Sequence, residues 1–533
     1  MKTAMLDAAS AAALGTDWLD AAVAPVSPYG ERLFARRAPF VPGREAEAQE
    51  SAERVAAVAQ QLDPERLDAV RGVLAASPDV ASVVARASLG ETLDDPSLLE
   101  LLRFCEAIER VDALLAAEAI FGPIGSEAVG ALAGALAPGK RGPRGFYLAE
   151  GFDPALGQAR GALAAAQAEL ESARGRQAER ISAELGRDLA GADEFILMRA
   201  DMPAALPAGV RVVREAATYL LCALELGEKS IAALERRESA LARAGAAEES
   251  VRERLSALVR THAAQLDAAA AALGELDVLL SAARFARTYQ CAPAQIVSDV
   301  GLAFQGGRFL PLAVALEADG RAFTPLDVAL HDAVVLTGPN MGGKSVCLQT
   351  CGFVALCASY GLPVPAASAQ TALFDEIAWL GMGRDAELGG LLSSFAREVV
   401  RMQEIFERNA PRLLILVDEF ARTTTPHEGT ALCIALLERL RERNACGLLA
   451  THLGGVASGA GARHFAVRGL RGIAARPPAA DLRAALAALA GEMDYTVAEV
   501  GADELSGGDA IALAALLGAD GRFVNAAYRA LSQ

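Results

Sequence analysis

The chain has 533 residues, of which 53% are hydrophobic and 22% are charged, and its formal net charge is −17. This length allows about two to four domains with substantial cores, and the balance of apolar and charged residues indicates a globular protein. The acidic charge argues against a protein dominated by contacts with phosphate groups, although a local basic stripe can exist on an acidic chain.

No stretch of the sequence resembles a membrane span, because the most apolar candidate, residues 128–138, is short and rich in glycine and alanine. Asp7, Asp17 and Asp20 interrupt any apolar core that a signal peptide would need. Eight cysteines without a C-x-x-C pair indicate a reducing compartment rather than a disulfide framework. We therefore expect a cytoplasmic protein that does not associate with membranes.

The first half of the chain is rich in alanine, which favours long helices. Residues 26–135 carry apolar positions three and four apart and predict a compact helical domain. Two long helical stretches follow, residues 154–185 and residues 211–289, the second with a break near Gly245. The segment between them contains an apolar patch at residues 195–198 that is compatible with a strand. Two long helices around a small insertion predict a pair of lever arms that end in a tip, and an ordinary helical bundle is the alternative.

From residue 296 to about residue 475, short apolar strands alternate with helices, and residues 412–417 and 446–450 are typical of fully buried strands. This alternation predicts a mainly parallel sheet that is covered on both faces. Residues 494–531 contain two more helical patterns, split near residues 518–521. The predicted domains are an N-terminal extension (1–25), a helical core (26–150), the levers (151–290) with their tip (about 186–209), the sheet domain (291–475) and a C-terminal helical segment (476–533).

A glycine-rich loop follows the buried strand at residues 333–336 and opens a helix. It consists of Gly338, Pro339, Asn340, Met341, Gly342, Gly343, Lys344 and Ser345. Such glycines let consecutive backbone N–H groups surround phosphate oxygens at the positive end of a helix. Lys344 would reach the β- and γ-phosphates and Ser345 would ligate Mg²⁺. Only four residues of this arginine-rich chain are lysine, and one of them occupies the loop position where an arginine fork would not fit. The loop predicts a nucleoside triphosphate with Mg²⁺.

Two further motifs stand where the later buried strands end. Asp418 follows residues 412–417 and would hold Mg²⁺, and the adjacent Glu419 could polarise the attacking water as a general base. Thr451 and His452 follow the strand at residues 446–450, which would let the imidazole of His452 sense the γ-phosphate. The alternative for His452 is an ordinary residue at the end of a strand.

At these residues the chain resembles the MutS family of DNA mismatch repair ATPases, which belong to the ABC-type ATPases. The phosphate loop has that family's form, Ser393-Ser394-Phe395 with Glu398 is similar to its Ser-Thr-Phe-x-x-Glu segment, and Phe323 resembles its adenine-stacking residue. The resemblance implies that ATP is sandwiched between two subunits, with Ser393 or Ser394 contacting the γ-phosphate bound by the partner. We therefore expect a homodimer or a heterodimer with a paralogue.

The resemblance also extends outside the motifs, over roughly residues 26–531. It implies an α/β P-loop ATPase domain of the ABC type, preceded by an all-α core and lever region with a small clamp-like insertion. Residues 494–531 are similar to the family's C-terminal helix-turn-helix. Only about 25 residues precede the core, so we expect the family's mismatch-reading domain to be missing.

What the ATP cycle acts on is left open between two hypotheses. The loop at residues 420–429 reads Phe-Ala-Arg-Thr-Thr-Thr-Pro-His-Glu-Gly and looks more like the MutS-related factors that reactivate adenosylcobalamin-dependent lysine aminomutases. This favours an ATPase that remodels a partner enzyme. The alternative is a DNA-structure clamp of the mismatch repair or recombination kind, favoured by the levers, the insertion and the helix-turn-helix. Arg187 and Arg199 near the tip face several carboxylates and do not form a phosphate-binding stripe.

Overall fold

The computed structural model describes residues 5–142, 145–189, 191–339, 342–381, 394–470 and 493–502, together with residues 504, 511, 514–515 and 518–531. The chain divides into two compact units. We call Met1–Arg71 with Gly274–Gln533 the sheet unit, and Gly72–Leu273 the helical unit. Within the described residues, no helix combines the length and the apolar character that crossing a membrane requires.

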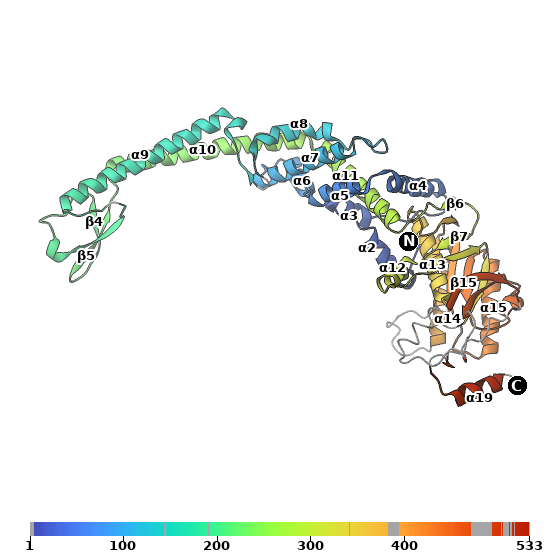
Figure 1. Ribbon diagram of the computed structural model, residues 1–533. Helices are drawn as coiled ribbons and strands as arrows, with labels where there is room; N and C mark the ends of the chain where they lie inside the picture. Colours follow the sequence, from blue (N-terminus) through green and yellow to red (C-terminus); the bar gives the residue numbers. More distant parts are fainter. Residues whose placement is uncertain are drawn as a thin grey trace. The chain divides into compact units, whose positions relative to one another are not determined.

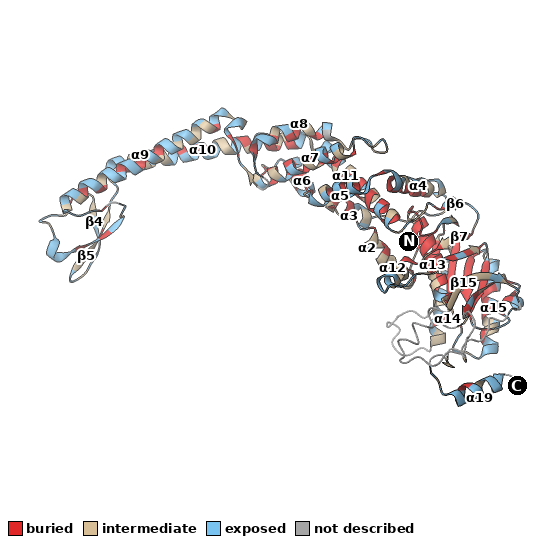
Figure 2. Ribbon diagram, in the orientation of Figure 1, coloured by how far each residue is buried: buried red, intermediate tan, exposed pale blue. Residues whose placement is uncertain are grey.

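A six-stranded sheet forms the centre of the sheet unit (Figure 1). Its order is β11 (Glu376–Leu380), β12 (Leu413–Asp418), β13 (Cys446–Ala450), β9 (Ala333–Thr337), β14 (His464–Leu470) and β15 (Met493–Val500). All neighbouring strands are parallel except β14 and β15. Every residue of β9, β11 and β13 is buried, as expected of strands covered on both faces (Figure 2). The predicted mainly parallel sheet is confirmed.

Alternate residues of the strands face two different helical layers. Ile415 and Val417 of β12 share a core with α14 (Ser394–Glu407), α15 (Pro426–Glu442) and α16 (Val456–Ala460). Leu416 faces the other way, towards Gly352 of α13 (Lys344–Ser359). Because side chains alternate along a strand, one apolar run supplies both cores.

A second, four-stranded sheet also packs against α13. Its order is β6 (Gln295–Val297), β10 (Ser368–Ala372), β7 (Leu302–Gly307) and β8 (Leu326–Leu330), and α12 (Leu310–Ala318) follows β7. Since α13 packs against strands of both sheets, it is buried continuously from Thr350 to Ser359. This explains why its sequence is apolar all round.

The first residues of the chain pack against the six-stranded sheet. They form α1 (Ala8–Ala13) and α2 (Thr16–Ala22), followed by α3 (Pro28–Ala35) and α4 (Glu45–Gln61). The backbone oxygen of Met5 accepts the N–H of Ile377 at 2.9 Å, and the Ser10 hydroxyl accepts the N–H of Trp379 at 2.8 Å. The segment at residues 5–22 therefore covers the edge of β11 and supplies hydrogen-bond acceptors for two of its backbone N–H groups.

The helical unit contains α6 (Ala81–Ser88), α7 (Asp95–Leu115), α8 (Ser126–Leu136) and the long helices α9 (Pro154–Leu185) and α10 (Glu228–Thr261). The short hairpin β1 (Lys140–Arg141) and β2 (Gly145–Phe146) precedes α9. Two further helices, α5 (Pro64–Ala76) and α11 (Ala263–Thr288), each have residues in both units.

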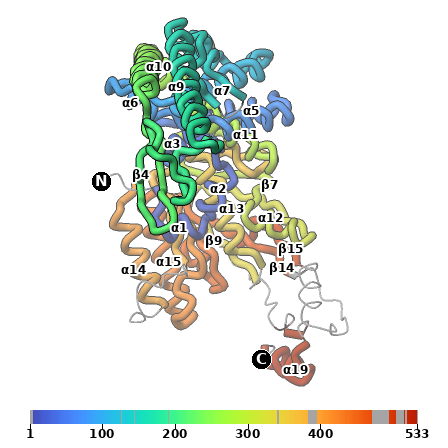
Figure 3. Tube along the Cα trace, turned by 90° about the vertical axis from the view of Figure 1, so that its left-hand side faces the viewer, coloured from blue at the N-terminus to red at the C-terminus, as the bar shows by residue number. Residues whose placement is uncertain are grey.

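Helices α9 and α10 lie side by side, as Figure 3 shows, and confirm the two predicted long helices. Their seam is made mostly of small residues, Ala166 and Ala173 on α9 and Ala233, Ala240 and Ala244 on α10. Spacings of seven and four residues keep these alanines on one face of each helix. Their small side chains allow the two backbones to approach closely.

Two details of the lever prediction are wrong. The second long helix begins at Glu228 rather than at residue 211, and it continues through Gly245 to end at Thr261. A single glycine destabilises a helix by only about 1 kcal/mol relative to alanine, and the packing of the neighbouring Ala244 maintains the helix here.

Residues 211–227 instead belong to the tip, which is larger than predicted. The tip is a three-stranded antiparallel sheet ordered β3 (Glu194–Met198), β5 (Tyr219–Leu224) and β4 (Val210–Glu215). The strand predicted at residues 195–198 is confirmed. β-Branched valines at positions 210, 212 and 213 favour a strand over a helix. The core of this sheet consists of Ile181, Leu189, Phe195, Leu197, Leu220 and Cys222.

The prediction for the C-terminal segment is wrong at its start. Residues 494–500, expected to be helical, belong to β15, which pairs with β14 from His464↔Val500 to Leu470↔Met493. This backbone pairing overrides the local helical pattern and extends the sheet beyond residue 475. Helix α19 (Gly521–Leu531) is present. Residues 476–492 of the predicted C-terminal helical segment lie outside the described residues, and so do residues 503, 505–510, 512–513 and 516–517 of the predicted helix-turn-helix.

Candidate active site

The phosphate loop joins β9 to α13 and has a backbone that only glycine adopts readily. Gly338 and Gly343 have φ angles of +156° and +90°. A Cβ atom on Gly342 would lie 2.8 Å from the Pro339 oxygen, which is too close. Asn340 and Met341 lie outside the described residues. The two glycines before Lys344 place the N-terminus of α13 directly at the loop, where anions are bound best.

Lys344 is the first residue of α13 and its side chain is 5% exposed. Its Nζ donates hydrogen bonds to the Gly338 oxygen at 3.0 Å and to the Pro339 oxygen at 3.2 Å. It also lies 3.6 Å from Oε1 of Glu419. The loop therefore holds a buried ammonium group between its own carbonyls and a carboxylate.

Asp418 ends β12, and its Oδ2 accepts the Ser345 hydroxyl at 2.8 Å. Burial raises the pKa of Asp418, and Glu419 adds to this, while Ser345, Lys344 and Arg422 oppose it. Oδ1 of Asp418 is also buried and has no hydrogen-bond partner among the described residues. A hydroxyl beside a carboxylate with an unused oxygen is a donor set that suits Mg²⁺, so these residues fit the ion that the sequence predicts.

Glu419 lies in the turn after β12, which we call the Glu419 turn (residues 419–423). Its carboxylate is 19% exposed and lies between Lys344 and Arg422, with Oε2 at 3.0 Å from a terminal nitrogen of Arg422. Glu419 and Ala421 have φ angles of +55° and +59°, in the left-handed region that disfavours residues with a side chain. The Ala421 N–H donates to Oε2 of Glu398 at 2.8 Å.

Ser394 is the first residue of α14, and its hydroxyl donates to the Thr423 hydroxyl of the same chain at 3.2 Å. Ser393 lies outside the described residues. His452 is exposed two residues beyond Ala450, which pairs with both Asp418 and Leu336. His452 therefore follows the same sheet edge as Asp418. Phe323 lies half-buried in the loop before β8, and base stacking by Phe323 stays a prediction.

The site therefore brings together Lys344, Ser345, Asp418 and Glu419 through direct contacts. A pattern in the sequence does not show this arrangement, because the phosphate loop follows β9 whereas Asp418 ends β12. These two strands are separated in the sheet by β13. Parallel strands bring their carboxyl ends to one edge, which is where ligands bind in open α/β sheets.

Two residues that contact β9 or the phosphate loop carried no signal in the sequence. Tyr495 of β15 lies against the phosphate loop, since a Cβ on Gly343 would be 3.2 Å from its Cδ1. The buried His464 lies 2.7 Å through Nε2 from the Thr337 hydroxyl, and its Nδ1 lies 3.0 Å from the Gly501 oxygen. Because a carbonyl only accepts, Nδ1 is the donor there. In the neutral ring, Nε2 then accepts the Thr337 hydroxyl. This histidine therefore anchors the end of β9 just before Gly338.

Residues 334–467, which include Lys344, Ser345, Asp418 and Glu419, match the family described as MutS domain V. They are a MutS-family ATPase domain. This domain is an ABC-type ATPase and implies binding of ATP and Mg²⁺, and ATPases of the MutS family typically dimerise.

Curated relatives carry the names MutS and MutS2. A DNA mismatch repair protein MutS of Granulibacter bethesdensis is 36% identical over 198 residues, which are 36% of this chain and 21% of that protein. A DNA mismatch repair protein MutS of Rhodopseudomonas palustris is 29% identical over 476 residues, covering 81% of this chain and 50% of that protein. An Endonuclease MutS2 of Gemmatimonas aurantiaca is 36% identical over 188 residues, 34% of this chain and 22% of that protein. The matched stretch thus spans half or less of each of these three relatives.

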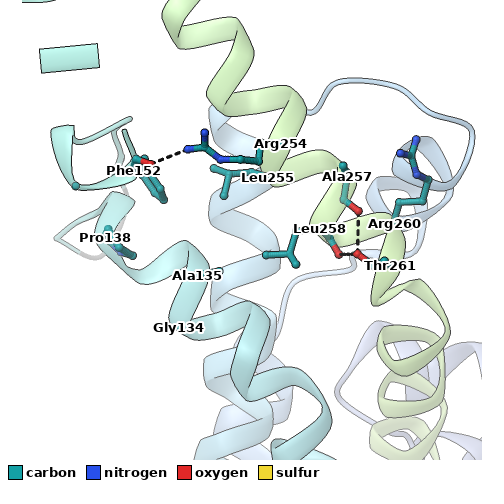
Figure 4. Close-up of a pocket in the computed structure, with 11 residues that line it drawn as sticks. Gly134, Ala135, Pro138, Phe152, Arg254, Leu255, Ala257, Leu258, Arg260 and Thr261 are labelled. Carbon is teal, nitrogen blue, oxygen red and sulfur yellow. Dashed lines mark hydrogen bonds between the residues drawn. The ribbon is translucent and has the colours of Figure 1, made fainter. Parts of the chain in front are cut away.

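A hollow of about 760 Å³ lies apart from the MutS-type site, within the helical unit (Figure 4). It is lined mainly by small and apolar residues of α8 and α10, such as Ala135 and Leu258. Arg254 at its rim is bound to Asp153 and to the Phe152 oxygen. The hydroxyl of Thr261 donates back to its own helix. Arg254 and Thr261 are therefore engaged within the fold, and we assign the hollow no ligand.

Proposed function

We propose that Lys344, Ser345, Asp418 and Glu419 bind Mg²⁺–ATP and hydrolyse it, and that the cycle remodels a partner enzyme. The observation that carries the first part is their direct contact at one sheet edge, beside a glycine-rich helix N-terminus. Ser345 and Asp418 would hold the ion, and Lys344 would exchange the loop carbonyls for phosphate oxygens. Bound Mg²⁺ supplies charge neutralisation at the β- and γ-phosphates.

Glu419 is proposed as the general base. Its carboxylate now pairs with Lys344 and Arg422. When Lys344 turns to the nucleotide, one of these partners leaves, and a carboxylate oxygen becomes available to accept the proton of the attacking water. His452, which follows the same sheet edge, is proposed to contact the γ-phosphate.

The complete site is proposed to need a second subunit. By the family resemblance, Ser394, the first residue of α14, or Ser393 before it in the sequence reaches the γ-phosphate bound by the partner, and Phe323 stacks on adenine. The partner is a second copy of this chain or a paralogue.

The ATPase assignment of these residues is tested by two variants. Lys344→Ala is expected to lose nucleotide-dependent behaviour, measured as binding of a fluorescent ATP analogue. Glu419→Gln is expected to bind ATP, to lower kcat by about 10²-fold or more and to trap an ATP-bound dimer detectable by light scattering. Hydrolysis at the normal rate by Glu419→Gln would show that another group is the base.

A protein target is supported by the charges and the exposed apolar residues of the tip. Two of its arginines are in ion pairs, Arg199 with Glu215 and Arg211 with Glu225. Arg187 donates to the Ile196 oxygen. Paired guanidinium groups contribute little to binding phosphates, because affinity for DNA comes from cations that replace its counterions. On the outer face of β3, the side chains of Ile196 and Met198 are 47% and 46% exposed. These features suit contact with a protein surface, and the loop at residues 420–429 suggests an adenosylcobalamin-dependent lysine aminomutase as that protein.

The second candidate is a DNA-structure clamp. It is favoured by the match of 81% of this chain to a protein named DNA mismatch repair protein MutS, a match too long to be confined to the ATPase domain.

Fluorescence anisotropy with homoduplex, mismatched and branched DNA, with ATP or ADP at two salt concentrations, separates the two candidates. We expect binding that is weak and vanishes with salt, and ATP hydrolysis that responds to inactivated aminomutase. Nucleotide-dependent DNA binding that persists near physiological salt, and that Lys344→Ala abolishes, would instead make the chain a DNA clamp.

A further inference from the structure

Helix α14 and the Glu419 turn are joined by three contacts within one chain. The hydroxyls of Ser394 and Thr423 are 3.2 Å apart, and the rings of Phe395 and Phe420 have centroids 6.4 Å apart. One helical turn further on, Glu398 accepts the Ala421 N–H at 2.8 Å. Positions 394, 395 and 398 lie on one side of the helix. The first turn of α14 and the Glu419 turn therefore form one packed element.

The Glu419 turn has a strained backbone conformation that depends on contacts from the surrounding structure. Glu419 and Ala421 both adopt left-handed φ angles without being glycine. Such conformations persist only where the surrounding structure holds them. The hydrogen bond from Ala421 to Glu398 lies in the middle of this turn and is buried.

Glu398 is suited to holding the turn, because it is 6% exposed and its carboxylate oxygen is the acceptor of that N–H. Burial raises the pKa of Glu398, while the Ala421 N–H and the nearby Arg422 oppose this effect. Arg422 also pairs with Glu419 itself. A continuous chain of contacts thus links Glu398 to Glu419 through the backbone of Ala421 and the guanidinium of Arg422.

We propose that Glu398 is a positioning residue for Glu419, which ties the orientation of the general base to the position of α14. This inference rests on the proposed roles of Glu419 as the base and of Ser394 as a contact to the partner's nucleotide. The first turn of α14 would then contact the ATP bound by the partner through Ser394, and would position Glu419 in the site of its own subunit through Glu398. Engagement of ATP in one site thereby orients the base in the other, which couples the two hydrolysis sites of a dimer.

The test compares three variants on the same helix. Glu398→Ala removes the acceptor, Glu398→Gln keeps an oxygen acceptor for the Ala421 N–H, and Glu407→Ala is a matched control at an exposed position of α14. We expect Glu398→Ala to lower kcat by about 10²-fold, the loss typical of a misplaced catalytic group. The Kd for a fluorescent ATP analogue should stay within about twofold of the parent value, because no nucleotide contact is removed. Glu398→Gln should keep most of kcat, and Glu407→Ala should be unchanged.

A double-variant cycle decides whether Glu398 acts through Glu419. In a Glu419→Gln background, Glu398→Ala is expected to cause no further loss, because the group that it positions is already gone. Losses that multiply would overturn the proposal, and so would a loss of kcat in Glu398→Ala that is matched by an equal loss in Glu398→Gln. If Glu419→Gln itself hydrolyses ATP normally, the proposed base is wrong. In that case the coupling through Glu398 is refuted along with it.

Discussion

Asp277 of α11 is a buried carboxylate on which one end of the sheet unit depends. Its side chain is fully buried, and its Oδ2 accepts the N–H groups of Val26 at 2.9 Å and Ser27 at 2.6 Å. Its Oδ1 lies 3.4 Å from the Ser281 hydroxyl and 3.9 Å from Arg71, whose side chain is 9% exposed. The carboxylate thus fixes the start of α3 and balances a buried cation.

We predict that Asp277→Ala lowers the free energy of unfolding of the sheet unit by about 4 kcal/mol. Breaking a buried ion pair by removing one partner costs about 3–5 kcal/mol, and this range already includes part of the penalty for the unpaired N–H groups. Asp277→Asn keeps one oxygen acceptor and loses the charge, so its expected loss is about 2 kcal/mol. A side chain larger than aspartate does not fit at position 277, because Gly30 packs so closely that a Cβ on it would already lie 2.4 Å from Oδ2 of Asp277.

The assay is urea unfolding followed by tryptophan fluorescence, since both tryptophans, Trp18 and Trp379, belong to the sheet unit. Glu275→Ala, at an exposed position of the same helix and within the sheet unit, is the control and should change stability by less than about 0.5 kcal/mol. A loss below about 1 kcal/mol in Asp277→Ala would refute the reasoning, because the two N–H groups and Arg71 would then have other partners.

Two further predictions concern the N-terminal segment and the cysteines. The pKa of Asp7 lies below its ordinary value: burial raises it, but hydrogen bonds from Arg401 and from the Ser10 N–H outweigh burial. A lowered folded pKa stabilises the fold above the unfolded pKa, and this contribution is lost as pH falls through the folded pKa. Asp7→Asn should therefore be less stable than the parent above about pH 5, with a gap in urea titrations that narrows progressively as pH falls below about 4; a gap that does not change between pH 6 and pH 3 would contradict the role of the charge. All eight cysteines are free thiols and only Cys291 is partly exposed, with burial raising its pKa to about 12. Because the thiolate is the reactive form, a thiol reagent at pH 8 should label the native protein slowly and the urea-unfolded protein eight times, whereas fast labelling of the native protein would show local opening.

The elements that were predicted well from the sequence are those whose residue pattern is compatible with one kind of secondary structure. A fully apolar run of only five or six residues bounded by polar residues is shorter than most buried helices and fits a buried strand, and β12 and β13 are correctly predicted. The lever helices are long and alanine-rich, which leaves few alternatives to helix. The errors fall on residues 211–227 and 494–500, where the local pattern fits more than one structure. Backbone pairing of β4 with β5 and of β15 with β14 makes both segments strands.

The sequence by itself determined the chemical groups of the ATPase site. The glycine-rich loop that ends in Lys344 and Ser345 follows one recognisable buried strand, and Asp418 and Glu419 stand at the end of another. The type of each residue dictates its chemistry. Only the tertiary structure decided how these groups meet. The order of the strands brings the ends of β9 and β12 to one edge on either side of β13, where the Ser345 hydroxyl lies 2.8 Å from Asp418. The packing of α14 brings Glu398 to the Ala421 N–H of the Glu419 turn. Contacts such as these join residues 23 to 73 positions apart, and a local pattern cannot encode them, because strand order and helix packing depend on how the whole chain buries its apolar surface.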